Sequence, residues 1–506
     1  MYYGYLPVKH SIPVLFAIVL FLLAACGDKP AIPASPTPQP KASENAWSIP
    51  HSDLDQELID LAKRHGLTGD PTKGRQLPNI NTPLAQLGIK LFFSRTLSGD
   101  LDVACATCHH PALGGGDNLS LSIGTNSNEP DMIGHHRKLK HRLVETTPRN
   151  TPTTFNIGLW DKVMFHDGRI ESLEQHPGKN GSGAITTPDV AYPATDPLAG
   201  NNLVHAQARF PVTSATEMRG ETFEQDGTPQ SCRVAIAERL GGYGAYKTTL
   251  PTPNTAYWLD AFRQAFNAPD GLPQVLINEQ NISAALSEYE RSQVFVNNPW
   301  KAYLKGNPAA ISEAAKQGAL LFFKTPEQKG FGCVNCHQGD AFTDEDFHHT
   351  LMPPLGPGKN KLTNDYGRWL VTNKPEDKFK FRTPSLLNVE VTGPWGHNGA
   401  YTSLANAVRH MLNPYRMALH YDAGQLQQTN LKKDNMRDNL REMFACDVAL
   451  PSQEHTEEQV RQLVAFLLTL TDPCVKDREC LSPWIPDNNA GIPMQLKAKG
   501  DNGKPL

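Results

Sequence analysis

Apolar residues recur at intervals of three and four along several stretches of the chain. This period is typical of amphipathic helices. The clearest examples are Leu54, Leu58, Leu61 and Ala62 near the N-terminus and Val460, Leu463, Val464, Leu467 and Leu468 near the C-terminus. Apolar–polar alternation with a period of two, which indicates strands, is scarce. The pattern therefore predicts a mainly α fold with long loops.

A different pattern occupies residues 13–25, which form an apolar run of 13 residues behind Lys9. A membrane-spanning helix needs about 20 apolar residues, so this run is too short to remain in a bilayer. It predicts a secretory signal peptide over residues 1–25. The sequence Leu-Ala-Ala-Cys that ends at Cys26 resembles a bacterial lipobox, and Gly27 then favours the outer membrane. The alternative is a plain signal peptide that happens to contain a cysteine.

Residues 26–50 are rich in Pro, Ala and Ser, which is typical of a tether without a core. No later segment is long and apolar enough to span a membrane. The 48 basic and 52 acidic residues leave a net charge of −4, which argues against nucleic acid as a partner. We therefore expect an exported globular protein, anchored on the periplasmic side as an outer-membrane lipoprotein at Cys26.

The chain contains an internal repeat. Residues 83–117 match residues 313–344: each has an amphipathic helix that contains Gly, ends in Phe-Phe and is followed by C-x-x-C-H. Residues 150–173 parallel residues 382–404 in the same way. We predict two homologous domains, 51–300 and 301–480, with a tail over 481–506.

The C-x-x-C-H motif places two thiols on one side of a helical turn, where each can form a thioether with a haem vinyl group, and its histidine reaches the iron. The two motifs are Cys105, Cys108 and His109, and Cys333, Cys336 and His337. A zinc site or a redox disulfide would explain paired cysteines, but neither explains a histidine in both copies. We therefore predict two cytochrome c-like domains, each with one covalent c-type haem.

Four cysteines remain after the two motifs and Cys26: Cys232, Cys446, Cys474 and Cys480. Cysteines in an exported protein favour disulfides. Cys474 and Cys480 are close enough in sequence to pair, but the sequence does not determine the pairing.

With these motifs, residues 80–470 resemble the bacterial di-haem cytochrome c peroxidases and their MauG-type relatives. The resemblance is carried by both C-x-x-C-H motifs, P-R-N-x-P-T, F-x-D-G-R-x-x-S-L-E, an E-M pair, T-x-P-x-x-H-N-G and A-V-x-x-M. It implies a peroxide-binding haem in the first domain, an electron-transfer haem in the second, and one calcium ion between them.

By this resemblance Glu217 is the distal carboxylate beside the first haem. A carboxylate can take a proton from hydrogen peroxide and return it to the leaving oxygen as the O–O bond breaks. The alternative is an exposed loop glutamate, because residues 177–216 are a Pro- and Gly-rich insertion relative to the family.

Three positions depart from the family pattern. His166 stands where the family has a Trp between the haems, and His176 stands where it has a Gln beside the glutamate; both are candidate catalytic residues. His166 and its repeat equivalent His397 are alternatively structural histidines bonded to haem propionates. Thr125 occupies the position of a removable distal His, which implies an open first haem.

The inserted run IGHHRKLKHR offers His135, His136 and His141 as substitutes for that distal His. A basic run of this kind is more often a solvated loop.

The resemblance also implies ligands for the second haem and for calcium. Met411 corresponds to the axial Met of the peroxidases, where MauG-type enzymes have Tyr; Tyr415 and Met417 are nearby alternatives, and a plain core Met is the competing interpretation. For calcium the resemblance indicates the Asn150 side chain with the carbonyl groups of Thr392 and Pro394, because oxygen ligands suit that ion.

Three functions are compatible with these features. The leading one is a peroxidase that reduces hydrogen peroxide with electrons from a small cytochrome or cupredoxin. The first alternative is a MauG-type enzyme that oxidises Trp or Tyr on a partner protein. The second is a non-catalytic electron-transfer cytochrome.

Overall fold

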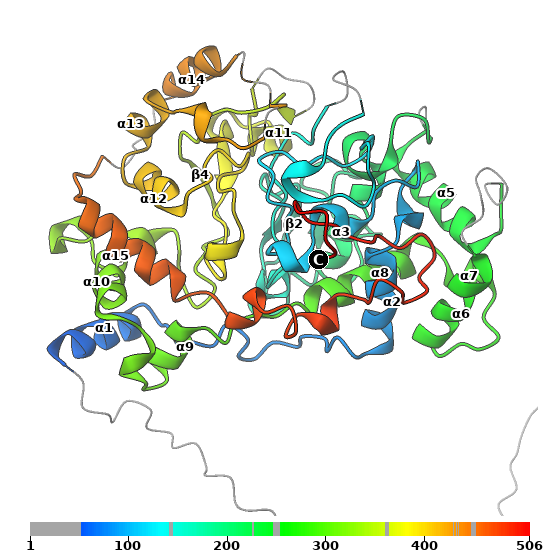
Figure 1. Cartoon of the computed structure of the whole chain (residues 1–506), viewed down its shortest axis with the longest axis horizontal. Helices are drawn as coiled ribbons and strands as arrows, with labels where there is room; N and C mark the ends of the chain where they lie inside the picture. Colours follow the sequence, from blue (N-terminus) through cyan, green and yellow to red (C-terminus); the bar gives the residue numbers. More distant parts are fainter. Residues whose placement is uncertain are drawn as a thin grey trace, which may run out of the picture. The chain divides into compact units, whose positions relative to one another are not determined.

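The computed structural model describes residues 52–140, 145–224, 227–245, 254–359, 364–428, 430–431, 433, 435–446 and 452–506 (Figure 1). The signal peptide, the tether, Cys26 and His141 lie outside these residues. The helices are α1 (Asp53–Arg64), α2 (Pro83–Phe92), α3 (Cys105–Cys108), α4 (Leu203–Ala208), α5 (Pro229–Gly241), α6 (Thr255–Ala265), α7 (Pro273–Leu276), α8 (Glu279–Arg291), α9 (Pro299–Leu304), α10 (Glu313–Phe323), α11 (Trp369–Thr372), α12 (Leu404–Leu412), α13 (Pro414–Leu419), α14 (Met436–Phe444) and α15 (Glu457–Leu468).

Strands are few and short, so the prediction of a mainly α fold is confirmed. Strands β1 (Val163–Met164), β2 (Ile170–Ser172) and β3 (Ile185–Thr186) form one antiparallel sheet, and β4 (Phe347–His349) pairs antiparallel with β5 (Lys380–Arg382). None of the described helices is long and apolar enough to cross a membrane.

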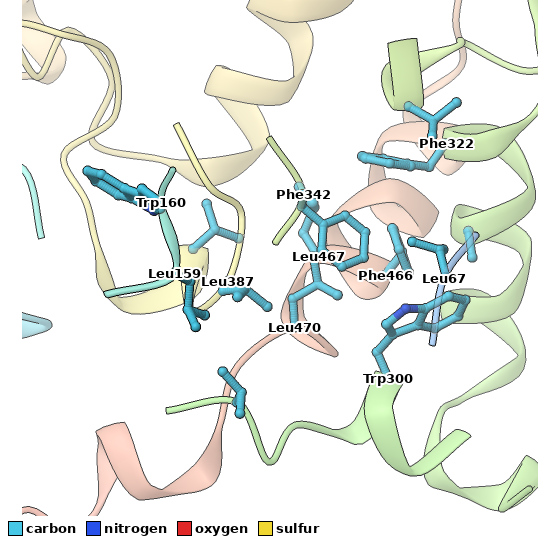
Figure 2. Close-up of a cluster of buried hydrophobic side chains, with 14 of the residues drawn as sticks. Leu67, Leu159, Trp160, Trp300, Phe322, Phe342, Leu387, Phe466, Leu467 and Leu470 are labelled. Carbon is cyan, nitrogen blue, oxygen red and sulfur yellow. The ribbon is translucent and has the colours of Figure 1, made fainter. Parts of the chain in front are cut away.

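Two large hydrophobic clusters form the core, and they do not follow the order of the chain. One contains α2, α5, α6 and α8, and the C-terminal residues 475–498 pack into it. The other contains α9, α10 and α15, and the N-terminal helix α1 packs into it. Figure 2 shows part of this second cluster, where Trp300, Phe322 and Phe466 meet. Both ends of the described chain are therefore tied to the core of the opposite half.

The repeat is visible as two helix pairs that cross at equivalent glycines. Helix α2 packs on α8, and α10 packs on α15 (Figure 1). A Cβ on Gly88 would lie 2.1 Å from Ala285 O, and a Cβ on Gly318 would lie 1.9 Å from Gln462 O. A glycine is therefore needed at both crossings, because a side chain would push the helices apart.

The two repeats meet at Phe295. Asn156 and Asn388, which occupy equivalent places in the repeats, both have a left-handed φ of 62° and both begin a 3₁₀ turn. The Asn156 amide donates to Phe295 O at 3.1 Å, and the Asn388 amide donates to the same oxygen at 2.9 Å. The domain boundary at residues 300–301 remains a prediction, since Ala46–Leu506 form one compact unit.

The insertion 177–216 is anchored by a buried ion network. Arg209 is fully buried and binds Glu279 at 2.6 Å, Asp196 at 2.7 Å and Asp189 at 3.0 Å. Arg233 binds Asp189 at 2.5 Å and Glu279 at 2.8 Å. The network joins the insertion to α5 and α8, so the insertion is part of the folded structure.

Among the remaining cysteines, Cys474 and Cys480 form a disulfide. Cys232 and Cys446 are free thiols.

Candidate functional site

The first C-x-x-C-H motif opens onto a cavity. Cys105 and Cys108 lie on the single turn of α3, and His109 follows as its C-cap. All three line a cavity with about 1250 Å³ of space free of atoms, its open mouth included. This open space lies directly beside both thiols and the imidazole, which is where a macrocycle attached to these cysteines would be placed.

The two motif histidines are held in the same way. His109 Nδ1 lies 3.2 Å from Gly115 O, and His337 Nδ1 lies 3.0 Å from Phe342 O. A carbonyl oxygen only accepts, so Nδ1 carries the proton and Nε2 keeps its lone pair. Burial lowers the pKa of His109 to about 4, so its imidazole is neutral at pH 7. A neutral imidazole bonded to a backbone carbonyl is the arrangement that iron ligation requires.

Three cations at the cavity wall suit the propionates of a haem. Arg149, Arg169 and Lys359 all line the cavity. They contact Asp167 at 2.6, 3.1 and 2.8 Å, and Arg149 also binds Asp365 at 2.7 Å. These three cations outnumber the two aspartates that they contact. The thiols, the histidine and these cations together fit a c-type haem.

Glu217 lines the same cavity as the first motif. It is half-buried in a turn of π-helix, Ala215–Arg219, hereafter the Glu217 turn. Burial raises the pKa of its carboxyl, against the opposing influence of Arg169 and Lys359. A carboxyl with a raised pKa can both accept and return a proton near neutral pH. The alternative of an exposed loop glutamate is therefore wrong.

The predicted substitutes for a distal histidine lie elsewhere. Thr125 is buried, and its hydroxyl donates to Ala215 O at 2.9 Å in the Glu217 turn. His135 pairs with Asp501 at 3.0 Å, and His136 is exposed. Of the described histidines, the cavity lining contains His109 and His166.

His166 and His397 lie on either side of one residue. His166 Nε2 donates to Asn150 O at 3.0 Å, and Asn150 N donates to His397 O at 2.8 Å. Burial lowers the pKa of His166 to about 4 and that of His397 to about 3, and Arg149 lowers both further. Both histidines are therefore neutral at pH 7, and His166 is the one that lines the cavity.

His176 is exposed and pairs with Glu174 at 2.9 Å. The structure thus brings Glu217 and His166 to the cavity but not His176.

The second motif lies at the edge of the other core cluster. Val334 is buried in that cluster, and Cys333, Leu404 and Val408 pack against it while remaining partly buried. Met411 lies seven residues after Leu404 and three after Val408 on α12, so it shares their helix face. Its side chain is 42% exposed, so the competing interpretation of Met411 as a plain core residue is wrong.

The alternatives to Met411 point to other surroundings. The Tyr415 ring contacts the Phe444 ring in a tilted arrangement with centroids 4.8 Å apart, and Met417 packs against a separate small cluster that contains Leu121.

The calcium site at Asn150, Thr392 and Pro394 stays a prediction. Asn150 N donates to His397 O at 2.8 Å, three residues after Pro394, and the Asn150 side-chain nitrogen donates to Leu119 O at 2.8 Å. A different group meets the distances for a metal: one atom each of Cys336, Asp344 and His348 lie within 4.8 Å of one another. Because Cys336 belongs to the second motif, that group borders the second haem site.

Sequence reasoning missed one residue of the cavity wall, Glu290, and one buried residue outside the lining, Arg137. Glu290 on α8 lines the cavity, is 7% exposed and has no hydrogen-bond partner at Oε2 within the described structure. Arg137, in the run interpreted as a solvated loop, is 2% exposed, so that interpretation is wrong for this residue. Neither residue belongs to a motif. The only sequence signal for Glu290 is that it is a charged residue on an otherwise apolar face of a helix.

The comparisons with known proteins agree with this geometry. The family model for di-haem cytochrome c peroxidase matches residues 82–309. Cytochrome c551 peroxidase from Pseudomonas aeruginosa is 28% identical over 334 residues, 66% of this chain and 73% of that one. Methylamine utilization protein MauG from Methylorubrum extorquens is 27% identical over 328 residues, 64% of this chain and 67% of that one.

A solved structure of a MauG-like protein associated with microbial copper homeostasis has the same fold. It superposes with a TM-score of 0.53 at 20% identity and covers 81% of this chain and 97% of its own. Over residues 82–309 the chain matches the di-haem cytochrome c peroxidase family of oxidoreductases, and over about two thirds of its length it is similar to both a peroxidase and a MauG protein.

Proposed function

We propose that the protein reduces hydrogen peroxide to water at the first C-x-x-C-H site, with electrons delivered through the second. The observation that carries this proposal is the position of Glu217, a carboxyl of raised pKa in the cavity that also holds Cys105, Cys108 and His109. An electron carrier gains nothing from an acid–base group beside an open iron site.

The haem at this site, when bound, supplies the iron that binds peroxide and the electrons that reduce it. Reduction of one peroxide to two waters takes two electrons and two protons, and it breaks the O–O bond. Glu217 takes the proton of the oxygen nearer the iron and donates it to the departing oxygen, which leaves as water. Arg169 and Lys359 favour the ionised carboxylate that accepts the first proton. His109 is kept in the tautomer with a free Nε2 by Gly115 O.

The position of Met411 supports peroxide reduction over the MauG-type reaction. A thioether ligand favours ferrous iron and raises the potential, whereas a Tyr oxygen favours ferric iron. Met411 shares a helix face with Leu404 and Val408, which pack against the same core cluster as Cys333, whereas the Tyr415 ring contacts Phe444. A second haem with a Met ligand accepts electrons from a mild donor, so we propose a small cytochrome or cupredoxin as that donor.

The proposal also includes a calcium ion and a cellular location. A calcium ion bound by Asn150, Thr392 and Pro394 would join the segments that carry His166 and His397. Export to the periplasmic side with a lipid on Cys26 is proposed from the N-terminal sequence.

The test compares Glu217→Gln with Glu221→Gln, an exposed neighbour outside the cavity lining. Glu217→Gln is expected to lower peroxide turnover by ~10²–10⁴-fold, the range for a lost acid–base group, with two haems still attached. Glu221→Gln is expected to behave like the wild type. Near-normal turnover in Glu217→Gln would show that another group moves the proton.

A further inference from the structure

Gly124 and Gly99 pack directly against the backbone of the Glu217 turn, and neither position has room for a side chain. A Cβ on Gly124 would lie 2.2 Å from Thr216 O and 2.4 Å from Glu217 O. A Cβ on Gly99 would lie 1.8 Å from Arg219 O. The two chain segments around these glycines therefore pack directly on the turn. Their positions determine the orientation of the Glu217 carboxyl.

On the first side, Arg137 holds the segment that contains Gly124. Its guanidinium donates to Ile123 O and Gly124 O, each at 2.6 Å, and to three further carbonyl groups of the same loop. The next residue, Thr125, donates its hydroxyl to Ala215 O at 2.9 Å and its backbone nitrogen to Thr216 O at 3.3 Å. Arg137 therefore holds the segment around Gly124 in place, and that segment in turn contacts the first residues of the Glu217 turn.

On the second side, Arg239 of α5 holds the segment that contains Gly99. It is fully buried and donates to Thr96 O at 2.8 Å, Ser98 O at 2.6 Å and Gly99 O at 2.9 Å. Gly99 N in turn donates to Met218 O at 2.8 Å, next to Glu217. The end of the turn is therefore held in the same way as its beginning.

Asp102 joins the two segments. It accepts from the Ser98 hydroxyl at 3.0 Å and from Asn126 N at 2.9 Å. Asp102 is 8% exposed and lies three residues before Cys105. The segments around Gly99 and Gly124 therefore contact the Glu217 turn and are joined to each other through Asp102, which lies beside the haem-attachment helix α3.

Neither arginine forms a salt bridge within the described residues. A buried cation without a carboxylate partner is costly, and only strong hydrogen bonds offset that cost. Here the acceptors are backbone carbonyl groups of the two segments that touch the turn. We propose that Arg137 and Arg239 are positioning residues that hold Glu217 at its working geometry. This inference rests on the proposed role of Glu217.

The experiment measures cyanide association with the oxidised holoprotein. Hydrogen cyanide must give up its proton as it binds ferric iron, and Glu217 is the group in the cavity that takes it. Arg137→Lys and Arg239→Lys keep the charge but lose most of the carbonyl contacts. Each is expected to slow cyanide association by about 10- to 100-fold, since a ~1 Å displacement of a catalytic group costs about that much. Arg263→Lys is the control, because Arg263 on α6 also donates to a carbonyl group, Gly271 O at 3.1 Å, outside the cavity lining.

A double-mutant cycle separates positioning from general damage. In a Glu217→Gln background, Arg137→Lys and Arg239→Lys are expected to change the association rate by less than about twofold, because groups that act through one residue are not additive. Thr125→Val removes one contact to the turn with little change in shape, and it is expected to slow association by a smaller factor in the same direction. Additive effects, or unchanged rates in both Lys variants with full haem content, would overturn the proposal.

The readout does not depend on turnover. If the wild type fails to reduce peroxide while the cycle is non-additive, the proposed function falls and the positioning role stands. If turnover is normal and the cycle is additive, the proposed function stands and the positioning role of Arg137 and Arg239 falls.

Discussion

Glu290 provides a prediction whose size follows from its environment. Its carboxyl is buried on α8 at the cavity wall, and Oε2 has no hydrogen-bond partner in the described part of the chain. Burial raises its pKa to about 8, so the side chain is mainly protonated in the folded protein at pH 7. In the unfolded chain a glutamate titrates near ~4.3 and is ionised at that pH. Folding at pH 7 therefore requires the carboxyl to take up a proton.

This proton uptake makes the stability depend on pH with a defined sign. The folded pKa is raised, so the free energy of unfolding is unaffected below about pH 4 and falls as pH rises toward 8. The loss is about 1.4 kcal/mol for each pH unit above the unfolded pKa, or about 3 to 4 kcal/mol at pH 7. Glu290→Gln has no such loss, because an amide does not titrate. The variant should therefore gain stability over the wild type as pH rises.

The assay is urea unfolding of the oxidised holoprotein at several pH values between 4 and 7. The difference in unfolding free energy between Glu290→Gln and wild type should grow with pH at about 1.4 kcal/mol per unit. Glu313→Gln, at an exposed carboxyl, is the control. A difference that stays constant across this pH range would refute the reasoning, because it would mean that Glu290 is ionised in the folded protein.

Other predictions concern the haems, the helix crossings and the ion pair between Arg149 and Asp365. Acid–acetone extraction should leave haem on the protein, and the pyridine haemochrome should report two haems per chain. Met411→Ala should abolish a methionine–iron charge-transfer band at the red end of the spectrum and lower the potential of the second haem, as measured by redox titration. Gly318→Ala should lower the unfolding free energy by about 1–3 kcal/mol through overpacking, and Gly116→Ala, with no atom closer than 3.8 Å, should not. Burial opposes the ionisation of Asp365, but Arg149 lowers its pKa to about 2; Asp365→Asn should therefore cost about 3 kcal/mol at pH 7 and progressively less below about pH 4, as measured by urea unfolding.

Features that depend on short sequence spacing were predictable. The C-x-x-C-H motif places two thiols and an imidazole within one helical turn, so no distant contact is needed to recognise it. The repeat glycines Gly88 and Gly318 appeared as part of a matched pattern, although their helix crossings required the structure. Glu217 was predicted through a motif match, and its place in the cavity agrees with that match.

Features that depend on contacts between distant segments were not predictable. Arg137 and Arg239 bind carbonyl groups, which any residue supplies, so no sequence pattern marks their partners. The predicted tail, residues 481–506, belongs to neither predicted domain, yet Leu496 N donates to Phe93 O and the Leu496 side chain is buried in the core of the first half. His176 lies two residues from Glu174, and that local pair directs it to the surface instead of the cavity.

The most direct test mixes the fully oxidised resting enzyme with an equimolar amount of hydrogen peroxide in a stopped-flow spectrometer. Thr125 is bonded to Ala215 O, and neither His135 nor His136 lines the cavity, so the first haem should have an open face. Its absorption should change at once, at a rate proportional to peroxide, and the resting EPR spectrum should contain a high-spin signal. A spectrum with low-spin signals alone, and no reaction until one electron is added, would contradict the account.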